Sequence, residues 1–482
     1  MKQRRRNRQL FFILLLALGL RIPLLSGSFW LDEAAQALES SRPLWQQFDI
    51  IPDFQPPLIH LLTHFALYVS SQEWWLRLIS ALIPGLITIW AVYKIGHRFF
   101  SKRTGNLASL LLATNSFHVF YSQELRPYSL PAMWASLSWL CLLNLTCKNK
   151  NEKQVISHKA KSWPHWLGYI LLTTAGLYSS YLYPFLIVSQ LTYILLTQKK
   201  NLQKKFLFFK FKSMNHTLKS FFTSLVVATF LFAPWIPTFF KQLKAGQALR
   251  QTIPGWEEVV SLTQVKALPL TVGKFVFGIS NLELNHFYLI PTGLLTLLLL
   301  GLSGYLFYQF KKDKIKIKPI IITTTWFVVP LITSWLVSFL VPVVRPKRLL
   351  FLLPALYLLI ATLIDLSLNH LNQLKQDKQK SLVKLSAITL LIILFALNLF
   401  SLSQYYLKPK FQRENWQSLY SEIQTRFPEK QTIAIFSFSQ PFAPWRWYNQ
   451  EHFPSLATGY NNIEQVPQLT STLKPIFDYD FV

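Results

Sequence analysis

The chain has 482 residues, of which 51% are hydrophobic and only 15% are charged. A soluble globular chain carries about 25% charged residues, so a water-soluble enzyme of this size is excluded. The high aromatic content excludes a disordered chain, and the two cysteines, Cys141 and Cys147, lie in one apolar segment and build no disulfide framework. The net charge of +28 comes in short runs between apolar segments, which is typical of a polytopic membrane protein and not of a nucleic-acid-binding one.

Eleven apolar segments are long enough to cross a bilayer, for which about 17–25 residues are needed. They lie at 10–27, 74–97, 104–122, 127–147, 164–182, 183–198, 219–240, 286–310, 317–341, 347–369 and 382–404. The first has the basic start and apolar centre of a signal peptide, but it lacks an Ala-Xaa-Ala cleavage site. We therefore expect it to remain as the first membrane span.

The distribution of charge predicts the topology. If the N-terminus lies inside and the spans alternate, the six inner segments hold 30 of the 49 Lys and Arg residues, whereas 17 of the 21 acidic residues lie outside. Basic inner loops are the rule for membrane proteins. The sequence thus predicts a multi-pass protein of the plasma (bacterial inner) membrane, with a cytoplasmic N-terminus and an extracytoplasmic C-terminus.

Three predicted outer segments are long, namely 28–73, 241–285 and 405–482. Within the first, residues 56–71 are apolar but short, and counting them as a span would invert every later loop. We expect them to form a helix that lies on the outer membrane interface, with His60 and His64 on one face. The spacing of these histidines also suits a zinc pair, but an interfacial role is the favoured interpretation.

The last outer segment reads as a separate small unit. Residues 411–427 have helical periodicity, and 431–440 contain a strand-like run. The sequence therefore predicts a transmembrane module over 1–404, which includes the interfacial helices of 28–73, and a small extracytoplasmic α/β domain over 405–482. The predicted fold class is an all-α polytopic membrane protein with this outer domain.

Acidic, basic and aromatic groups gather at the predicted outer membrane surface. They are Asp32 and Glu33 after the first span, Gln55 before a Pro-Pro pair, Glu124, Arg126 and Tyr128 between spans three and four, and Arg345, Lys347 and Arg348 between spans nine and ten. A carboxylate can act as the base for an acceptor hydroxyl. Cations can hold a lipid phosphate as it becomes the leaving group.

Each of these groups also has a simpler interpretation. Asp32 and Glu33 suit the first turn of a helix, where the helix dipole favours negative charge. Glu124 and Arg126 suit a surface ion pair of small energetic value. The basic residues at 345–348 suit contact with lipid headgroups. The co-location of all of them on one side of the membrane is what favours a chemical role.

The order of motifs resembles that of the GT-C superfamily of membrane glycosyltransferases. The similarity is greatest to the family 39-like group, which includes protein O-mannosyltransferases and lipid A aminoarabinose transferases. The motifs are WLDEAAQ at 30–36, QPPLIHLLTHF at 55–65, the stretch from EWWLRL to LRPYSL at 73–130, LFAPWIPTFFKQL at 231–243 and RPKRLLFLLPALYLLIA at 345–361. The outer loop 241–285 is too short for the inserted domain of the eukaryotic mannosyltransferases, which favours a bacterial-type enzyme.

The resemblance implies an inverting transfer of a sugar from a polyprenyl phosphate to an acceptor outside the membrane. It implies that Asp32 acts as the base, with Glu33 and Glu124 as further catalytic carboxylates, and that Arg126, Tyr128 and Gln55 bind substrate. Arg345, Lys347 and Arg348 would hold the donor phosphate. Some relatives also place a divalent metal between such carboxylates. The acceptor, whether protein, lipid or polysaccharide, stays open.

Two other classes of function fit the sequence less well. A transporter or flippase of lipid-linked glycans would also have many spans and basic inner loops, but it would place polar groups at mid-membrane on broken helices in two matching halves. A structural membrane scaffold would give no reason for clustered outer acids and bases. A transferase is therefore the favoured prediction.

Overall fold

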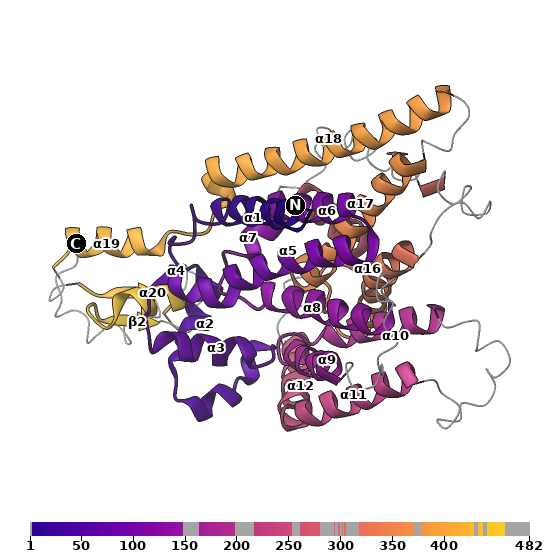
Figure 1. The fold of residues 1–482 in the computed structure, drawn as a ribbon. Coiled ribbons are helices and arrows are strands. Elements are labelled where there is room, and N and C mark those ends of the chain that lie inside the picture. Colours follow the sequence, from indigo (N-terminus) through magenta and orange to yellow (C-terminus); the bar gives the residue numbers. More distant parts are fainter. Residues whose placement is uncertain are drawn as a thin grey trace.

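In a computed structural model of the chain, the structure describes residues 2–147, 163–197, 216–252, 261–279, 318–370, 377–428, 432–436 and 441–457, with 294, 297, 298, 301, 303 and 304. This part is almost entirely helical (Figure 1). The α-helices are α1 (Lys2–Gly19), α2 (Leu31–Ser41), α3 (Leu58–Leu67), α4 (Glu73–Arg77), α5 (Ile83–Ile95), α6 (Lys102–Thr114), α7 (Ser116–Tyr121), α8 (Ser129–Thr146), α9 (Trp163–Leu177), α10 (Tyr183–Thr197), α11 (His216–Phe232), α12 (Ile236–Thr252), α14 (Gln264–Phe277), α16 (Lys318–Val337), α17 (Leu353–His370), α18 (Asp377–Leu407), α19 (Trp416–Arg426) and α20 (Ala443–Asn449).

Short 3-10 or π-helical turns and one small sheet complete the described structure. The turns are η1 (Leu44–Phe48), η2 (Ile51–Asp53), η3 (Leu78–Leu82), η4 (Gly96–Phe100), η7 (Ala233–Trp235), η8 (Pro346–Leu352) and η10 (Pro409–Phe411). The strands β1 (Ala434–Phe436) and β2 (Ser455–Ala457) pair in parallel.

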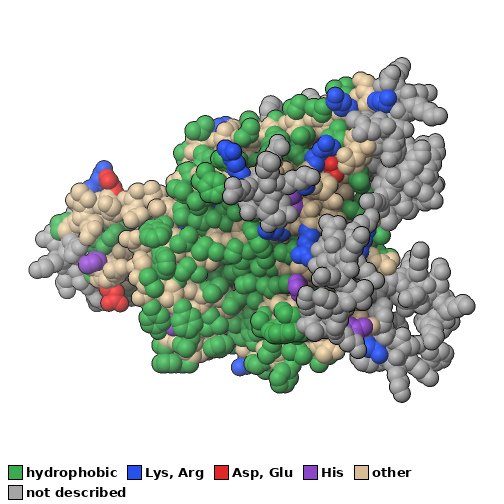
Figure 2. Space-filling view, in the orientation of Figure 1, with side chains coloured by type: hydrophobic (Ala, Val, Ile, Leu, Met, Phe, Trp, Pro, Cys, Tyr) green, Lys and Arg blue, Asp and Glu red, His purple; other side chains and the backbone are tan. Residues whose placement is uncertain are grey.

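Long apolar helices form the body of the molecule. By length and composition, five helical stretches of the described chain can cross a membrane: Glu73–Phe100, His216–Ala248, Lys318–Val337, Pro346–Asn369 and Lys380–Leu407. Shorter apolar helices, including Arg8–Gly19 and Tyr183–Thr197, accompany them. Hydrophobic side chains cover the middle of the face shown in Figure 2, whereas Lys and Arg gather mainly toward the end away from α19 and α20.

The predicted span 104–122 is two helices and not one. Asn115 ends α6 and begins α7, because its side chain accepts a hydrogen bond from the His118 backbone N–H. The amide nitrogen of Asn115 donates to the backbone oxygen of Phe275 at 3.0 Å and to the Tyr357 hydroxyl at 2.8 Å. A buried Asn that satisfies its own backbone in this way offers an alternative to continuous helix, and it ties α7 to α14 and α17.

Contacts at the two ends of the bundle fit the predicted alternation of four spans. At one end, Asn106 of α6 donates to Gln9 of α1 at 3.4 Å, and Arg103 lies 3.4 Å from Asp365 of α17. At the other end, the Tyr405 hydroxyl of α18 donates to Gln123 at 3.0 Å. The starts of α1 and α6 thus lie beside the end of α17, and the ends of α7 and α18 lie together.

One predicted span falls mostly outside the described residues, and one predicted outer loop contains a buried helix. Most of the predicted span 286–310 falls outside the described residues. The segment 241–285, predicted as an outer loop, contains α14, whose Ala267, Phe275 and Phe277 side chains are buried in the main hydrophobic core. Apolar residues at helical spacing in α14 explain why this segment packs into the bundle.

The expected interfacial helix is α3, but its histidines do not reach toward an interface. His60 is fully buried, with its Nε2 atom 2.7 Å from the Asp53 carboxylate. His64 is also buried, and its Nδ1 atom lies 2.9 Å from the backbone oxygen of Ser40 at the end of α2. The expectation of an interfacial role for the two histidines was therefore wrong, because both imidazoles find hydrogen-bond partners within the segment 31–68.

The C-terminal segment lies against the first predicted outer segment. The expected helix and strand are α19 and β1, and α20 packs on α2 at one end of the bundle (Figure 1). The Trp447 ring lies 5.6 Å from the ring of Phe29, just before α2. The division of the chain into a module at 1–404 and an outer domain at 405–482 stays a prediction.

Candidate functional site

Four segments that are distant in the sequence meet where the polar residues were predicted to gather. They are the start of α2, the turn between α7 and α8, the turn η8, and the segment that follows α18. Asp32 and Glu33 stand in the first turn of α2, which suits their charge. The site is therefore assembled by tertiary structure from the ends of apolar helices, where polar side chains leave the hydrophobic core.

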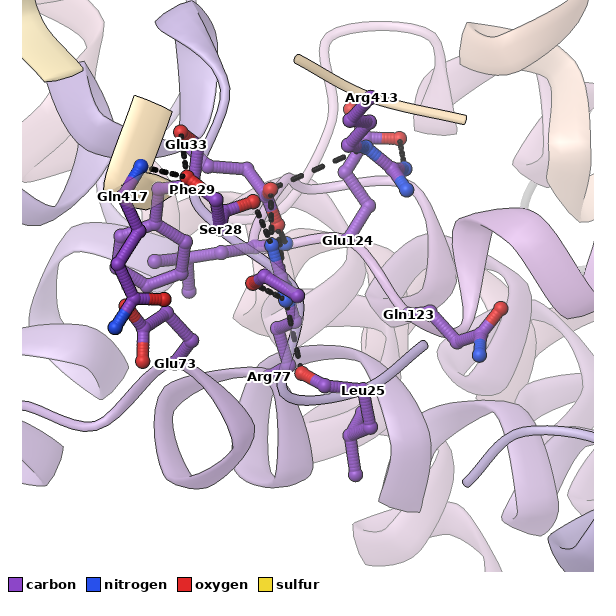
Figure 3. Close-up of polar contacts among 12 residues, drawn as sticks. Leu25, Ser28, Phe29, Glu33, Glu73, Arg77, Gln123, Glu124, Arg413 and Gln417 are labelled. Atoms are coloured by element: carbon purple, nitrogen blue, oxygen red, sulfur yellow. Dashed lines mark hydrogen bonds and ion pairs between the residues drawn. The ribbon is translucent and has the colours of Figure 1, made fainter. Parts of the chain in front are cut away.

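Glu33 is enclosed by cations and amides. Its side chain is fully buried, and Arg77 of α4 donates to both carboxylate oxygens at 2.8 and 2.6 Å, as Figure 3 shows. The Leu125 backbone N–H donates to Glu33 at 2.6 Å. Burial alone would raise the pKa of Glu33, but Arg77, Arg413 and the Leu125 amide together hold it below its ordinary value.

Arg77 also fixes the chain that leads into α2. Its guanidinium donates to the backbone oxygens of Leu25 at 2.8 Å, Ser28 at 3.1 Å and Gly27 (Figure 3). All three carbonyls lie between α1 and α2. The Glu33–Arg77 pair thus positions the segment that carries Asp32.

Glu124 has a different partner from the one predicted. Arg413, from the segment after α18, lies 2.7 Å from its carboxylate, whereas Arg126 pairs elsewhere. Glu124 is 1% exposed, and burial raises its pKa above the ordinary value, although Arg413 and Lys347 act to lower it. The interpretation as a surface Glu124–Arg126 pair is therefore wrong, because the turn at 122–128 points the two side chains toward different partners.

Asp32 differs from the other carboxylates of the site. It is half-buried, and within the described part of the chain its carboxylate has neither a hydrogen-bond donor nor an ion-pair partner. The Asp32 backbone oxygen accepts a hydrogen bond from Arg126 at 3.4 Å. The Asp32 carboxylate also interacts electrostatically with Arg348. Asp32 thus keeps its lone pairs available beside a cationic wall.

Asp53 joins the site although the sequence did not single it out. Its carboxylate lies 3.8 Å from Arg126 and 2.7 Å from His60, and the amide of Gln55 also donates to it. Gln55, a predicted substrate-binding residue, is buried and donates to Gln36 of α2 at 2.7 Å. These opposite charges and hydrogen bonds outweigh burial and hold the pKa of Asp53 below its ordinary value.

The predicted cations of η8 face the same region. The Lys347 ammonium lies over the rings of Tyr128 and Trp30, at 5.3 and 5.9 Å from their centroids. Arg348 donates to the backbone oxygen of Val343 at 3.3 Å. Arg345 precedes the turn and acts on Arg348 through its charge. Together with Arg126, these residues concentrate positive charge in one place.

An apolar cavity adjoins this cationic group. It has a volume of about 340 Å³. Arg348 stands in its wall, and so does Phe54, whose backbone adopts a left-handed conformation with φ 49° between Asp53 and Gln55. A non-glycine residue in this region is strained, and such strain clusters at functional sites. The remaining wall comes mostly from apolar side chains of 181–185, 239–246 and 337–343. Cations beside an apolar cavity suit an amphiphile with an anionic head.

The donor set does not fit a divalent metal between the predicted carboxylates. The oxygens of Glu33 and Glu124 are already bound by Arg77 and Arg413. Over the residues that the structure places, no group of three His, Cys, Asp or Glu side chains could hold a metal ion. Guanidinium groups therefore supply the positive charge between these acids.

Sequence reasoning missed three members of the site. Arg77 stood within a predicted span, where an ionisable residue is a candidate for function by default. Asp53 stood close to the Pro-Pro motif, three residues before Pro56. Arg413 gave no local signal, since its role depends on contacts with residues almost 300 positions earlier.

The chain is similar to known proteins in sequence and in fold. Residues 54–237 match the sequence model of the family described as dolichyl-phosphate-mannose-protein mannosyltransferase. Among solved structures, ArnT from Cupriavidus metallidurans in the apo state has 12% sequence identity and a TM-score of 0.57, covering 96% of this chain and 88% of that one. The same protein bound to undecaprenyl phosphate has 11% identity and a TM-score of 0.56, with 97% and 88% covered.

An archaeal structure has the same fold. The Archaeoglobus fulgidus oligosaccharyltransferase tethered to an acceptor peptide has 13% identity and a TM-score of 0.53, covering 94% of this chain and 64% of that one. A search of curated protein sequences finds no match. The similarities confirm the resemblance that the motifs predicted, and the chain is a helical polytopic membrane protein with the GT-C fold.

Proposed function

We propose that the protein is a glycosyltransferase that moves a sugar from a polyprenyl phosphate to an acceptor hydroxyl outside the plasma membrane. The observation that carries the proposal is the Asp32 carboxylate, which forms no ion pair with the residues that the structure describes and lies near the cations Arg126 and Arg348, with Lys347 and an apolar cavity beside them. The family described for residues 54–237 uses a dolichyl phosphate sugar, and the similar ArnT structure holds undecaprenyl phosphate. The active site then lies on the outer face, with the N-terminus in the cytoplasm and the C-terminus outside.

The donor binds by its two chemically different ends. The prenyl chain enters the apolar cavity, and the phosphate lies against Arg126, Arg345, Lys347 and Arg348, which stabilise the charge that develops on it. Tyr128 and Trp30 hold Lys347 in place through their ring faces. Gln55 holds Asp53, which in turn orients Arg126.

Transfer requires one bond to form and one to break. The acceptor oxygen attacks the anomeric carbon as the bond from that carbon to the phosphate oxygen breaks, and the configuration inverts. Asp32 takes the hydroxyl proton, and polyprenyl phosphate leaves. Glu33 and Glu124 act as carboxylates that keep Asp32 and its surroundings in position, since each is already bound by an arginine.

The experiment that tests this function separates chemistry from transport. We would isolate the sugar-linked polyprenyl phosphate that accumulates in cells lacking the gene and incubate it with the purified protein and envelope acceptors in detergent. Without a sealed bilayer a flippase changes nothing, whereas a transferase releases polyprenyl phosphate, measured by mass spectrometry. Release that equals that of heat-denatured protein would overturn the proposal and leave the transporter as the next hypothesis.

Removing one donor-binding cation should weaken donor binding. We expect Lys347→Gln to raise KM for the donor about tenfold, because a hydrogen bond to a charged group contributes about 1.5–3 kcal/mol. The matched control is Lys408→Gln, an exposed lysine after α18, which should leave KM unchanged. Steady-state kinetics in detergent would measure both. An unchanged KM in Lys347→Gln would remove this residue from the phosphate site.

A further inference from the structure

Arg413 connects the C-terminal segment to two carboxylates of the proposed site. Its guanidinium lies 2.7 Å from Glu124 and 3.9 Å from Glu33, as Figure 3 shows for both acids. The guanidinium also lies over the Phe120 ring, 3.8 Å from its centroid. Its side chain is only 12% exposed. A buried arginine with these three contacts is held far more tightly than an arginine in a surface pair.

The chain that follows Arg413 is fixed to the segment that leads into α2. The Gln417 backbone N–H donates to the Ser28 hydroxyl at 3.0 Å. The Tyr448 hydroxyl accepts from the Phe29 backbone N–H at 2.7 Å and donates to Glu73 at 2.8 Å. The part of the chain after α18 is therefore hydrogen-bonded to Ser28 and Phe29, shortly before Asp32.

We propose that Arg413 is a positioning residue of the transfer site, which keeps the Glu124 carboxylate ionised and oriented beside Asp32 and the donor cations. The inference rests on the proposed function and extends it to the C-terminal segment, which no motif connected with catalysis. Arg413 acts through Glu124 and touches neither substrate. The segment after α18 thereby becomes part of the site.

The charge balance around Glu124 explains why Arg413 is needed. Glu124 interacts electrostatically with six charged or titratable groups, namely Arg413, Lys347, Arg126, Glu33, Tyr121 and Tyr405. Burial and the nearby Glu33 charge raise the pKa of Glu124, and Arg413 is the strongest influence in the other direction. Without Arg413, a buried carboxylate would take up a proton at a higher pH.

The test is a pH profile with a spectroscopic control. In Arg413→Gln, the acid limb of the transfer rate should move up by about 1 to 3 pH units, the size of the effect of one close opposite charge. Arg413→Lys should keep the acid limb close to its wild-type position, because it keeps the charge. Arg426→Gln is the matched control, since Arg426 pairs with Glu422 in α19 and its side chain is 69% exposed. That variant should keep the wild-type profile.

Infrared spectroscopy makes the result independent of sugar transfer. The carboxylic acid C=O band of Glu124 is identified by its loss in Glu124→Gln, and its appearance on acidification is followed in the full-length protein. We expect the band at a higher pH in Arg413→Gln than in the wild type. If Arg413→Gln does not fold, the same band in Arg413→Lys decides, with an upward shift smaller than 1 pH unit expected. An unshifted band and pH profile would overturn the inference, whereas a shifted band without any transfer activity would overturn only the proposed function.

Discussion

An Asp32→Asn variant is expected to lose transfer activity by a factor of about 10² to 10⁴, the usual contribution of a general base. The amide keeps the size of the carboxylate but cannot take the acceptor proton. Because Asp32 makes no ion pair within the described chain, the substitution leaves no buried charge without a partner. We therefore expect the loss in kcat while the Tm remains that of the wild type.

A control in the same outer segment makes this prediction specific. Asp49 is exposed, and Asp49→Asn should retain full activity. Asp32→Glu should retain part of the activity, since it keeps the base but displaces it. Release of polyprenyl phosphate by the purified variants measures the rates, and donor binding is measured separately. Full transfer by Asp32→Asn would remove Asp32 from the role of base, and Asp53 would be tested next.

The second large effect concerns stability. Arg77→Met is expected to lower the free energy of unfolding by about 3–5 kcal/mol, because it leaves the fully buried Glu33 carboxylate without its main partner. It also removes the donor for three backbone oxygens between residues 25 and 28. The double variant Arg77→Met with Glu33→Leu should lose less than the sum of the two single changes.

A surface pair of the same residue types serves as the control. Arg42 and Glu39 form a half-exposed pair one turn apart, and Arg42→Met should cost about 0–1 kcal/mol. Thermal unfolding in detergent compares the variants. Equal losses in Arg77→Met and Arg42→Met would contradict the assignment of the buried pair as the structural centre of this segment.

The Glu33–Arg77 pair also predicts how stability depends on pH. The folded-state pKa of Glu33 is below its ordinary value of 4.5, so its stabilising contribution is present above that value. The contribution is lost as the pH falls through the lowered folded-state pKa. The difference in stability between the wild type and Glu33→Gln should therefore shrink below about pH 4.5 and stay constant above pH 6.

The sequence by itself determined the class of protein and the neighbourhood of the site. Hydropathy and charge are local quantities, so apolar runs predicted membrane helices, and charged residues next to span ends predicted where Asp32, Glu124 and Arg126 would lie. The helical break at Asn115 and the burial of His60 escaped this reasoning, because both depend on hydrogen bonds to other parts of the fold.

Only the tertiary structure decided which charge faces which. Glu124 has Arg126 two residues away, yet it pairs with Arg413 from the far end of the chain, and Arg126 pairs with Asp53. Glu33 of α2 pairs with Arg77 of α4. Ion pairing depends on distances of a few ångströms between side chains, and the packing of helices sets these distances. For that reason Asp32, whose carboxylate forms no ion pair within the described chain, could be distinguished from Glu33, Asp53 and Glu124 only after the helices were placed together.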